Sequence, residues 1–389
     1  MQKKLIALAV AGLVSAPAFA QSNVTVYGIA DAYVGIGSHG DNDFRGVGSA
    51  GLSGSRIGFR GTEDLGNGLK AVFTVEQGFS IDTGSGLGDA SRQAFVGLNG
   101  AFGTVSLGRQ YAPGYHATAT YDVFGAAAVS PRAILVGAAN GLSGVWTDGV
   151  DTETIAAAKG LSIAPNSAAR WNNSVAYTGS FSGLTARAIY SFNGVETNTY
   201  AQDGADVERT GKPGDDDAMG VSLDYANGPL SVGATYHLLK NDAEDQKEWM
   251  VAGGYDFGVL KLIASYQQAK NVGFEKDNDA KLWQVGALVP VGAAGNVHVA
   301  YGEVKYDWGS EDPKAKSFGL AYTHALSKRT TGYVGMNYTK NDDGLGLGAV
   351  GSASAKVKDL PVGGGTFTGT VAETGEKSKI FVVGVRHAF

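Results

Sequence analysis

The 389-residue sequence contains no cysteine, so disulfide bonds cannot hold its fold together. Proline is scarce, at 9 residues, and no segment beyond the N-terminus is apolar for the roughly 18 residues that a membrane-spanning helix needs. Basic residues are not in excess either, because 31 Lys and Arg face 37 Asp and Glu, and no nucleic-acid partner is expected. The folded state must therefore be stabilised by something other than disulfide bonds or apolar membrane-spanning helices.

The first twenty residues have the composition of an export signal. Lys3 and Lys4 precede a short apolar run over residues 5–14, and Ala18-Phe19-Ala20 forms a small-x-small cleavage site. The run is too short to span a bilayer as a helix. We therefore expect residues 1–20 to be a signal peptide, removed after Ala20, and residues 21–389 to form the mature protein.

The rest of the sequence is rich in glycine (59 residues) and aromatics (10%), and it alternates apolar and polar residues over short segments. In the first such segment, 24–36, Val24 and Val26 share one face while Thr25 and Tyr27 share the other, as in a β-strand. A closed antiparallel barrel is the non-helical structure that satisfies every backbone group in lipid. The sequence thus predicts an all-β transmembrane barrel.

About sixteen strands are predicted, separated by connections of alternating length. Residues 37–54 are expected to form a loop, and the strands are expected near 24–36, 55–62, 69–79, 92–98, 103–111, 170–180, 184–192, 219–225, 230–239, 248–257, 260–270, 281–289, 296–308, 315–324, 331–339 and 379–389. Short turns such as Asn227-Gly228 alternate with long charged connections such as 193–218. Short turns at one rim and long loops at the other are typical of outer-membrane barrels and have no reason to occur in a soluble β-sandwich.

The alternation stops between residues 113 and 169. This stretch is rich in Ala, Gly, Thr and Val, and it is too apolar for an ordinary disordered linker. A connection of that length without regular structure is usually functional. We expect it to pack inside the barrel as a constriction loop.

The last strand ends on an aromatic residue. Phe381, Val383, Val385, His387 and Phe389 share one face. We expect this strand to pair with the first, so that no edge remains, and Phe389 to carry the signal for barrel assembly. The alternative is a plain edge strand that happens to finish there.

Several blocks resemble the general porins of Gram-negative bacteria, in the form found in β-proteobacteria. The resemblance covers the whole mature chain and is carried by residues 55–71 (SRIGFRGTEDLGNGLKA), 92–98 (RQAFVGL), 103–110 (GTVSLGRQ), 172–177 (NNSVAY), the opening 24–28 (VTVYG) and the ending 387–389 (HAF). It implies a sixteen-stranded trimeric barrel whose third outer loop folds into the lumen, with Arg56, Arg92 and Arg170 in a wall cluster facing that loop. The sequence departs from the family in the length and alanine content of 113–169 and in Ala388, where relatives often carry a basic residue.

Pore residues are predicted from the strand faces. Arg56 and Arg60 lie opposite Ile57 and Phe59 and so point inward, Arg92 is expected inward because it is opposite Phe95, and Arg170 begins the strand after the long loop. Asp122 is the candidate for the acidic side of the constriction, while Asp148, Asp151 and Glu153 could instead lie at the mouth. The alternatives are solvated arginines paired with local acids, and a loop-capping role for Asp122.

Arg109 shares its face with Val105 and Leu107, so alternation points it outward. A charge on the lipid face costs about 2–4 kcal/mol at the bilayer midplane. We therefore expect a neighbouring subunit to cover Arg109 and to pair it with Asp82 or Asp89.

The function predicted from these features is an outer-membrane channel for passive diffusion of small hydrophilic solutes and ions, with weak anion preference. Alternatives are a substrate-specific porin with a binding ladder and a plugged structural or adhesive barrel. An enzyme is not expected, because the six histidines are scattered and no nucleophile motif or metal spacing occurs; no cofactor or metal is expected. The expected partners are two further copies of the chain in a homotrimer, outer-membrane lipid and lipopolysaccharide, the barrel-assembly machinery and the solutes themselves.

Overall fold

A computed structural model describes residues 23–84, 86, 91–125, 127–136, 169–192, 217–241, 243–274, 276–307, 312–343, 345–348, 360–362, 365–367 and 375–389. The predicted signal peptide, 1–20, lies outside these residues, as do Asp89, Asp148, Asp151 and Glu153. Within the described part of the chain, no helix is long and apolar enough to cross a membrane.

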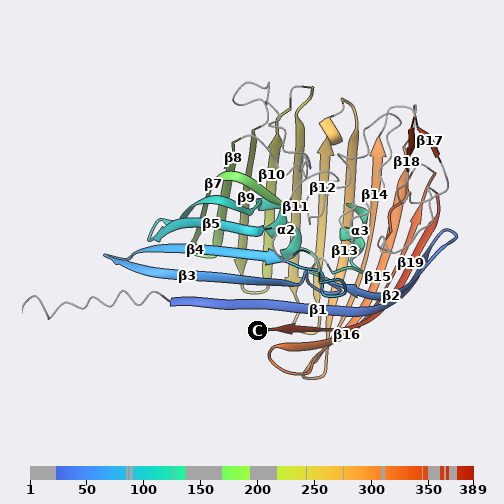
Figure 1. Ribbon diagram of the computed structural model, residues 1–389, viewed down its shortest axis with the longest axis horizontal. Coiled ribbons are helices and arrows are strands. Elements are labelled where there is room, and N and C mark those ends of the chain that lie inside the picture. The colour runs from blue at the N-terminus through green and yellow to red at the C-terminus, as the bar shows by residue number, and fades with distance from the viewer. Residues whose placement is uncertain are drawn as a thin grey trace, which may run out of the picture.

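Of the described strands, 17 form one antiparallel sheet that closes on itself (Figure 1). Its members are β1 (Asn23–His39), β2 (Asn42–Ser49), β3 (Arg56–Gly66), β4 (Leu69–Gly78), β5 (Ser91–Gly100), β6 (Gly103–Tyr111), β7 (Arg170–Phe181), β8 (Leu184–Ser191), β9 (Ala218–Asn227), β10 (Leu230–Leu239), β11 (Gln246–Asp256), β12 (Lys261–Lys270), β13 (Asp279–Val291), β14 (Gly295–Asp307), β15 (Lys314–Ala325), β16 (Thr330–Asn341) and β19 (Lys377–Ala388). β1 pairs with β19, so the described sheet has no open edge.

The second position in the barrel is shared by two strands. β3 pairs with the first part of β1, over residues 23–29, and β2 pairs with the second part, over residues 32–39. The 17 strands of the sheet therefore make 17 − 1 = 16 barrel strands, as predicted. The prediction of a loop over 37–54 was wrong for most of that range, because β1 continues to His39 and β2 returns beside it.

The predicted constriction loop enters the barrel and contains two short helices, α2 (Pro113–Thr120) and α3 (Pro131–Leu135) (Figure 1). Each begins with a proline, whose missing N–H costs nothing in a first helical turn. Ser130 caps α3 by accepting a hydrogen bond from the Ala133 N–H at 3.3 Å. The expectation of an irregular stretch is corrected here for its first part.

Two smaller features complete the described elements. A 3₁₀ turn, η1 (Val272–Phe274), follows β12, and a separate two-stranded ribbon, β17 (Leu360–Val362) and β18 (Gly365–Phe367), lies in the last long connection. At the opposite rim the turns are tight. In the β3–β4 turn, Asn67 and Gly68 have φ angles of 53° and 78°, which is the left-handed conformation that an Asn-Gly hairpin requires.

The outward faces of the strands are apolar and exposed. Val34, Leu107 and Val221 show exposed fractions of 56%, 54% and 52%. Their inward neighbours include Asp31 and Ser106, which are buried. An apolar outside with a polar inside is the reverse of a soluble barrel and fits a lipid surround.

Candidate functional site: the constricted lumen

Helix α2 is fixed to the barrel wall through a buried histidine. The Gly114 N–H donates to His237 Nε2 at 2.9 Å, and His237 Nδ1 lies 3.1 Å from Glu248 Oε2. Because Nε2 accepts, Nδ1 carries the proton and donates to Glu248. Both side chains are fully buried. The helix is therefore held against β9 and β10.

The segment around helix α3 is fixed to the next part of the wall. Arg132 donates to Gln267 Oε1 from Nε at 3.1 Å and from Nη2 at 2.9 Å, and Asn337 Nδ2 donates to the Val129 carbonyl at 3.2 Å. The side chain of Ile134 is 1% exposed against this wall. The loop thus covers the inner side of β12–β16 and crosses the lumen from β6 to reach it (Figure 1).

The wall on the other side of the lumen carries three arginines gathered around Glu76 and Tyr111. Arg92 Nε donates to Glu76 Oε1 at 2.8 Å, and Arg56 Nη1 lies 3.9 Å from the same oxygen. Arg92 also donates to the Tyr111 hydroxyl at 2.8 Å, and the Arg170 guanidinium carbon lies 5.5 Å from the centre of the Tyr111 ring. We call Arg56, Arg92 and Arg170 the arginine cluster. The structure brings these three predicted residues together.

Arg92 reaches the lumen through a β-bulge. Gln93 pairs with Glu76, but Ser91 pairs with the very next residue of β4, so Arg92 is the extra residue. Phe95 lies on the same, inward side as Gln93 and not on the outward side. The argument that placed Arg92 opposite Phe95 was therefore wrong, although its conclusion holds: simple alternation would send Arg92 outward, and the bulge turns it in.

Arg60 stands beside the cluster and does not join it. Its guanidinium carbon lies 5.0 Å from the centre of the Tyr27 ring, and its side chain is exposed to the lumen. The Tyr27 hydroxyl donates to Glu76 Oε2 at 2.9 Å. Tyr27 and Glu76 thus connect Arg60 to the arginine cluster, and sequence reasoning did not assign either residue to the site.

Asp122 does not face the arginine cluster. Its side chain is 4% exposed, and it accepts hydrogen bonds from the Phe124 N–H at 3.0 Å, from Ser130 Oγ at 2.5 Å and from Gln284 Nε2 at 3.2 Å. These bonds fold the loop between α2 and α3 and tie it to β13. The prediction of Asp122 as the acidic side of the constriction is corrected, because its carboxylate is used in loop capping.

Comparison with known proteins decides which family this barrel represents. The sequence model of the Gram-negative porin family matches residues 7–344 of this chain. The chain belongs to this family. Outer membrane porin protein 32 of Delftia acidovorans is 36% identical over 402 residues, with 100% of both chains covered. The anion-selective porin from Comamonas acidovorans is a solved structure with 29% identity and a TM-score of 0.68, covering 95% of this chain and 100% of that one. OmpT of Vibrio cholerae in its trimer form shares the fold, with 15% identity, a TM-score of 0.59, and 95% and 99% coverage.

The porin is accordingly an outer-membrane barrel with short periplasmic turns, long extracellular loops and a third loop in the lumen, and it works as a channel for passive diffusion of small hydrophilic solutes. Its lumen is narrowed by α2 and α3 on one side and by the arginine cluster on the other. Diffusing solutes meet both surfaces.

Aromatic residues at the narrow part of this porin were missed by sequence reasoning. Tyr111 and Tyr115 stack with ring centres 3.9 Å apart and planes 7° apart, and the His116 ring stands edge-on to both. Burial, and then the nearby Arg187 charge, lower the pKa of His116 to about 4, so it is neutral at pH 7. Alternation could not reveal these residues, because they lie where β6 passes into α2.

A second ion pair lies in the lumen beside α2 and was also missed. Arg187 Nη1 on β8 is 2.6 Å from Asp224 Oδ2 on β9. Burial, together with a hydrogen bond to Asp224, raises the pKa of Tyr121 well above its usual range. This pair neutralises its own charges, whereas the arginine cluster has more positive than negative groups.

Arg109 is outward on β6, as predicted, and half-buried. Its Nη1 donates to Asn172 Oδ1 of β7 at 2.5 Å. Asp82 is exposed in the connection after β4, and Asp89 lies outside the described residues. Arg109 thus has a partner within its own chain, and its predicted pairing across subunits stays a prediction.

Phe389 closes the barrel. Its N–H donates to the Gly28 carbonyl at 3.1 Å, and its carbonyl accepts from the Gly28 N–H at 3.0 Å. A Cβ on Gly28 would lie 2.3 Å from the Phe389 ring, so only glycine fits there. The pairing of the last strand with the first is confirmed, and the alternative of a plain edge strand is wrong.

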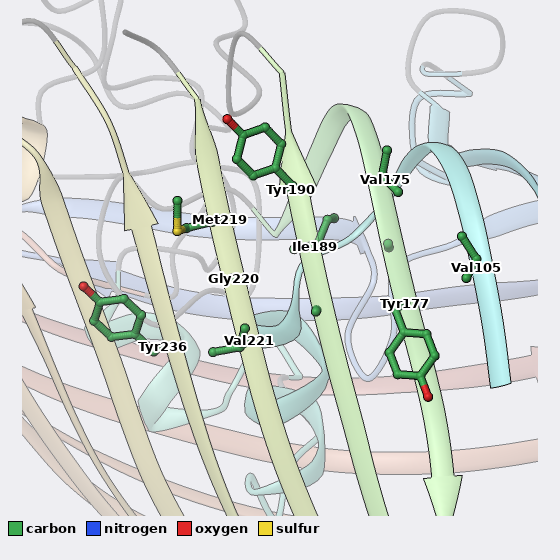
Figure 2. A pocket seen from close by; sticks show the side chains of 11 residues that line it. Val105, Val175, Tyr177, Ile189, Tyr190, Met219, Gly220, Val221 and Tyr236 are labelled. Carbon is green, nitrogen blue, oxygen red and sulfur yellow. The ribbon is translucent and has the colours of Figure 1, made fainter. Parts of the chain in front are cut away.

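The outer wall of the porin has an apolar hollow over β6–β10, of about 460 Å³ (Figure 2). Val105, Val175, Val221 and Tyr236 surround it, and helix α2 lies behind the strands in this view. Gly220 also lines the hollow, and a Cβ on this residue would lie 2.8 Å from the His237 ring. The hollow lies on the outward side of the strands and is no part of the solute path.

Proposed function

We propose that the porin passes small hydrophilic solutes with a weak preference for anions, set by the arginine cluster. The observation that supports this most is the charge count of the arginine cluster together with Glu76. Arg56, Arg92 and Arg170 contribute three positive charges and Glu76 one negative charge, leaving 3 − 1 = 2. Asp122, the one carboxylate in the described loop residues 113–136, is buried.

The size of the preference follows from the surroundings of these charges. Two unit charges 4 Å apart interact by about 1 kcal/mol in water, and salt screens them beyond about 8–10 Å at physiological ionic strength. An anion near the cluster is therefore favoured modestly, and less so at high salt. The Comamonas porin, 29% identical over nearly the whole chain, is named as anion-selective, which supports the same sign here.

The test is the reversal potential of the purified protein in a planar bilayer under a KCl gradient. The unaltered protein should give a potential of anion-selective sign. Replacing all three clustered arginines, as Arg56→Gln, Arg92→Gln and Arg170→Gln, should abolish or invert it. Arg329→Gln, in an exposed turn, is the matched control and should change nothing. A clear cation preference in the unaltered protein would overturn the proposal.

The same recordings separate the alternative functions. A plugged barrel would show no open-state steps. A substrate-specific porin would show currents that saturate, or are blocked, as one solute is titrated. A general porin should give ohmic steps that scale with salt conductivity.

We further propose that the functional unit is a homotrimer, with Arg109 at the subunit contact. The support is that OmpT, which shares the fold, is named in a trimer form, and that an outward arginine among apolar neighbours needs cover from lipid. Arg109→Ala should lower the temperature at which trimers dissociate in detergent. Asp82→Ala should do the same if Asp82 is the partner, and unchanged melting of both would refute the assignment.

Two expectations about the chain ends belong to this proposal. Export should remove residues 1–20, so N-terminal sequencing of the membrane protein should begin at Gln21. The assembly machinery should recognise the terminal aromatic residue, so Phe389→Ala should leave less barrel in the outer membrane than Phe381→Ala, which removes an aromatic from the same strand. Equal assembly of the two variants would argue against a special role for Phe389.

A further inference from the structure

The turn η1, in the extracellular connection after β12, folds inward over the core that holds the start of the constriction loop. The Val272 N–H donates to the Asn278 carbonyl at 2.7 Å, and Asn278 Nδ2 donates to the Val272 carbonyl at 2.8 Å, so the turn is closed on itself. Its Phe274 side chain packs against a buried cluster that consists of Ala112, Trp171, Ile189, Ala218 and Leu239. Ala112 directly precedes α2, so an extracellular turn and the first residues of the loop share one core.

A row of buried hydrogen bonds leads from this turn to α2. The Gly273 N–H donates to Gln246 Oε1 at 2.8 Å, and Gln246 Nε2 donates to Glu248 Oε1 at 2.6 Å. The other oxygen of Glu248 accepts from His237, which accepts from the Gly114 N–H in the first turn of α2. All three side chains are 0% exposed. We call Gln246, Glu248 and His237 the relay.

The chemical type of each relay residue fits its place in the row. Gln246 lies between a backbone N–H, which needs an acceptor, and a carboxylate, which needs a donor, and a neutral amide offers one of each. Glu248 accepts on both sides. His237 donates from Nδ1 and accepts at Nε2. A change at one position therefore sets donor against donor or acceptor against acceptor at the next.

Burial makes the relay costly to disturb. The Trp171 ring lies 5.0 Å from the His237 ring and is itself 0% exposed. Hydrogen bonds in a buried row strengthen one another, and a buried polar group that loses its partner pays the full cost of desolvation. A displacement of η1 is therefore passed along the relay to α2.

One residue beyond Gly114, α2 contacts the open wall of the channel. The Tyr115 ring stacks on Tyr111, with ring centres 3.9 Å apart. The Tyr111 hydroxyl accepts from Arg92 at 2.8 Å and donates to Glu76 at 2.9 Å. The first turn of α2 thus lies between the relay and the arginine cluster, and a shift of this turn changes the passage that solutes use.

We propose that Gln246 is a positioning residue of the channel, which transmits the placement of the extracellular turn η1 to helix α2 and so keeps the constriction at a steady width. The inference uses only the conduction of solutes through the lumen and does not depend on the sign of the ion preference. Because coupling between two sites is reciprocal, a loosened α2 should also loosen η1.

The test compares a single substitution with an exchange of two side chains. Gln246→Glu sets two carboxylates against each other in the buried row. The exchange variant carries Gln246→Glu together with Glu248→Gln. In it the carboxylate at position 246 accepts from the Gly273 N–H and from the amide at position 248, and that amide accepts from His237 Nδ1. The exchange matches a donor to an acceptor at each of these contacts and keeps the net charge.

Two measurements follow α2 in these variants, namely hydrogen–deuterium exchange of peptides that cover 113–120 and single-channel recording. Gln246→Glu should speed amide exchange over 113–120 at least about tenfold, because one hydrogen bond to a charged group is lost, and it should give more frequent partial closures. The exchange variant should return both values towards those of the unaltered protein. The control, Asn241→Ala, loses a bond to the Ala243 N–H in the neighbouring exposed connection and should change neither.

A purely local role for Gln246 gives a different result. Faster exchange over 271–274 with unchanged exchange over 113–120 would overturn the proposal, and so would an exchange variant that behaves like the single variant. Phe274→Ala loosens η1 without burying a charge, so it supplies the test where Gln246→Glu does not assemble. It should speed exchange over 113–120, and unchanged exchange there would equally overturn the proposal.

Discussion

The inner wall formed by β3–β7 and the inner wall formed by β11–β16 follow the same strand alternation, but their inward residues differ. On the first wall Arg60 is exposed to the lumen, and Arg56 and Arg92 retain 16% and 14% side-chain exposure. On the second wall Met250, Leu282 and Val304 are no more than 2% exposed, because the third loop covers them. The loop decides which half of the barrel is a water-facing surface and which is a protein core.

The difference changes what one residue type does. Glu76, on the open wall, sits among arginines and contributes to the field that a solute meets. Glu248, on the packed wall, is fully buried, accepts from Gln246 at 2.6 Å and orients the histidine that holds α2. A carboxylate on the open wall therefore affects selectivity, while one on the packed wall affects the position of the loop.

The largest change should come from placing a charge in the packed interface. Leu135, 0% exposed, lies in α3 against this wall. Leu135→Asp would bury an unpaired carboxylate at a cost of about 3–5 kcal/mol, which the loop avoids by leaving the wall. Single-channel conductance should rise, and the loop should become cleavable by added protease.

The matched control for this change is Thr74→Asp on the open wall, where Thr74 is half-buried. A charge there stays hydrated, so conductance should remain near that of the unaltered protein while anion preference falls. If Leu135→Asp kept normal conductance and protease resistance, the loop would not depend on the packed wall as argued.

The next largest effect concerns the turn between β2 and β3, which contains Gly51, Leu52 and Ser53. The buried Asp31 carboxylate accepts from the N–H groups of Gly51, Leu52 and Ser53 at 3.1, 2.9 and 2.8 Å, and from the Tyr333 hydroxyl at 2.6 Å. Asp31→Ala would leave these donors without their acceptor, at a cost of about 3 kcal/mol.

The turn matters to the loop because the Gly51 carbonyl accepts from the Ala128 N–H at 2.9 Å. The unfolding transition of the Asp31→Ala variant in urea should shift to a lower urea concentration. It can be followed by heat-modifiable electrophoretic mobility. Asp64→Ala is the control, since its carboxylate accepts from Gly66 N–H in an exposed turn and should cost under about 1 kcal/mol. Similar shifts for both variants would contradict a special role for the buried turn.

The sequence was sufficient for the barrel and for the inward placement of Arg56 and Arg60. Alternation of apolar and polar residues is a local signal, so faces such as that of Arg56 and Arg60 could be read directly. The family resemblance added Arg170, which lies at the very start of β7 and has too few neighbours for a period to be seen.

The remaining features depend on contacts between distant segments. The bulge at Arg92 appears only when β4 and β5 are paired, and the turn after β2 exists because Asp31 binds its backbone. Asp122 has the same sequence signal whether it caps a loop or lines a pore; its partner Gln284 is 162 residues away. Such outcomes follow from closure of the barrel around its loop, which no local pattern contains.

A smaller effect should appear on acidification. His116 in α2 is packed against Tyr111 and Tyr115 and lies near Arg187, and its pKa is lowered to about 4 chiefly by burial. The folded-state pKa of His116 lies below the ordinary value of about 6.5. The contribution of the neutral imidazole to folding stability is therefore complete above pH 6.5 and is lost as pH falls from there towards 4. We expect the docked loop to lose about 3 kcal/mol over that range.

The loss should be visible as increased closing events or current noise at pH 4.5 relative to pH 7. His116→Gln cannot gain this proton and should show a flatter pH response, while His324→Gln, exposed near a periplasmic turn, should respond like the unaltered protein. An identical pH response in His116→Gln and the unaltered protein would remove His116 from the account.

The smallest effect, and the sharpest comparison of the two walls, comes from one pair of isosteric changes. Glu76→Gln removes the negative charge that touches Arg56 and Arg92, so the net charge beside the solute path rises by one and anion preference should increase. At about 4 Å in water one charge is worth about 1 kcal/mol, which corresponds to a reversal-potential shift of a few millivolts to some tens of millivolts at low salt. The shift should vanish near 1 M salt, where the screening length is about 3 Å.

Glu248→Gln removes the same charge from the packed wall, where the loop keeps solutes away, and should leave the reversal potential unchanged. Equal shifts from both changes would mean that the field in the lumen is set by the total charge of the barrel and not by the open wall.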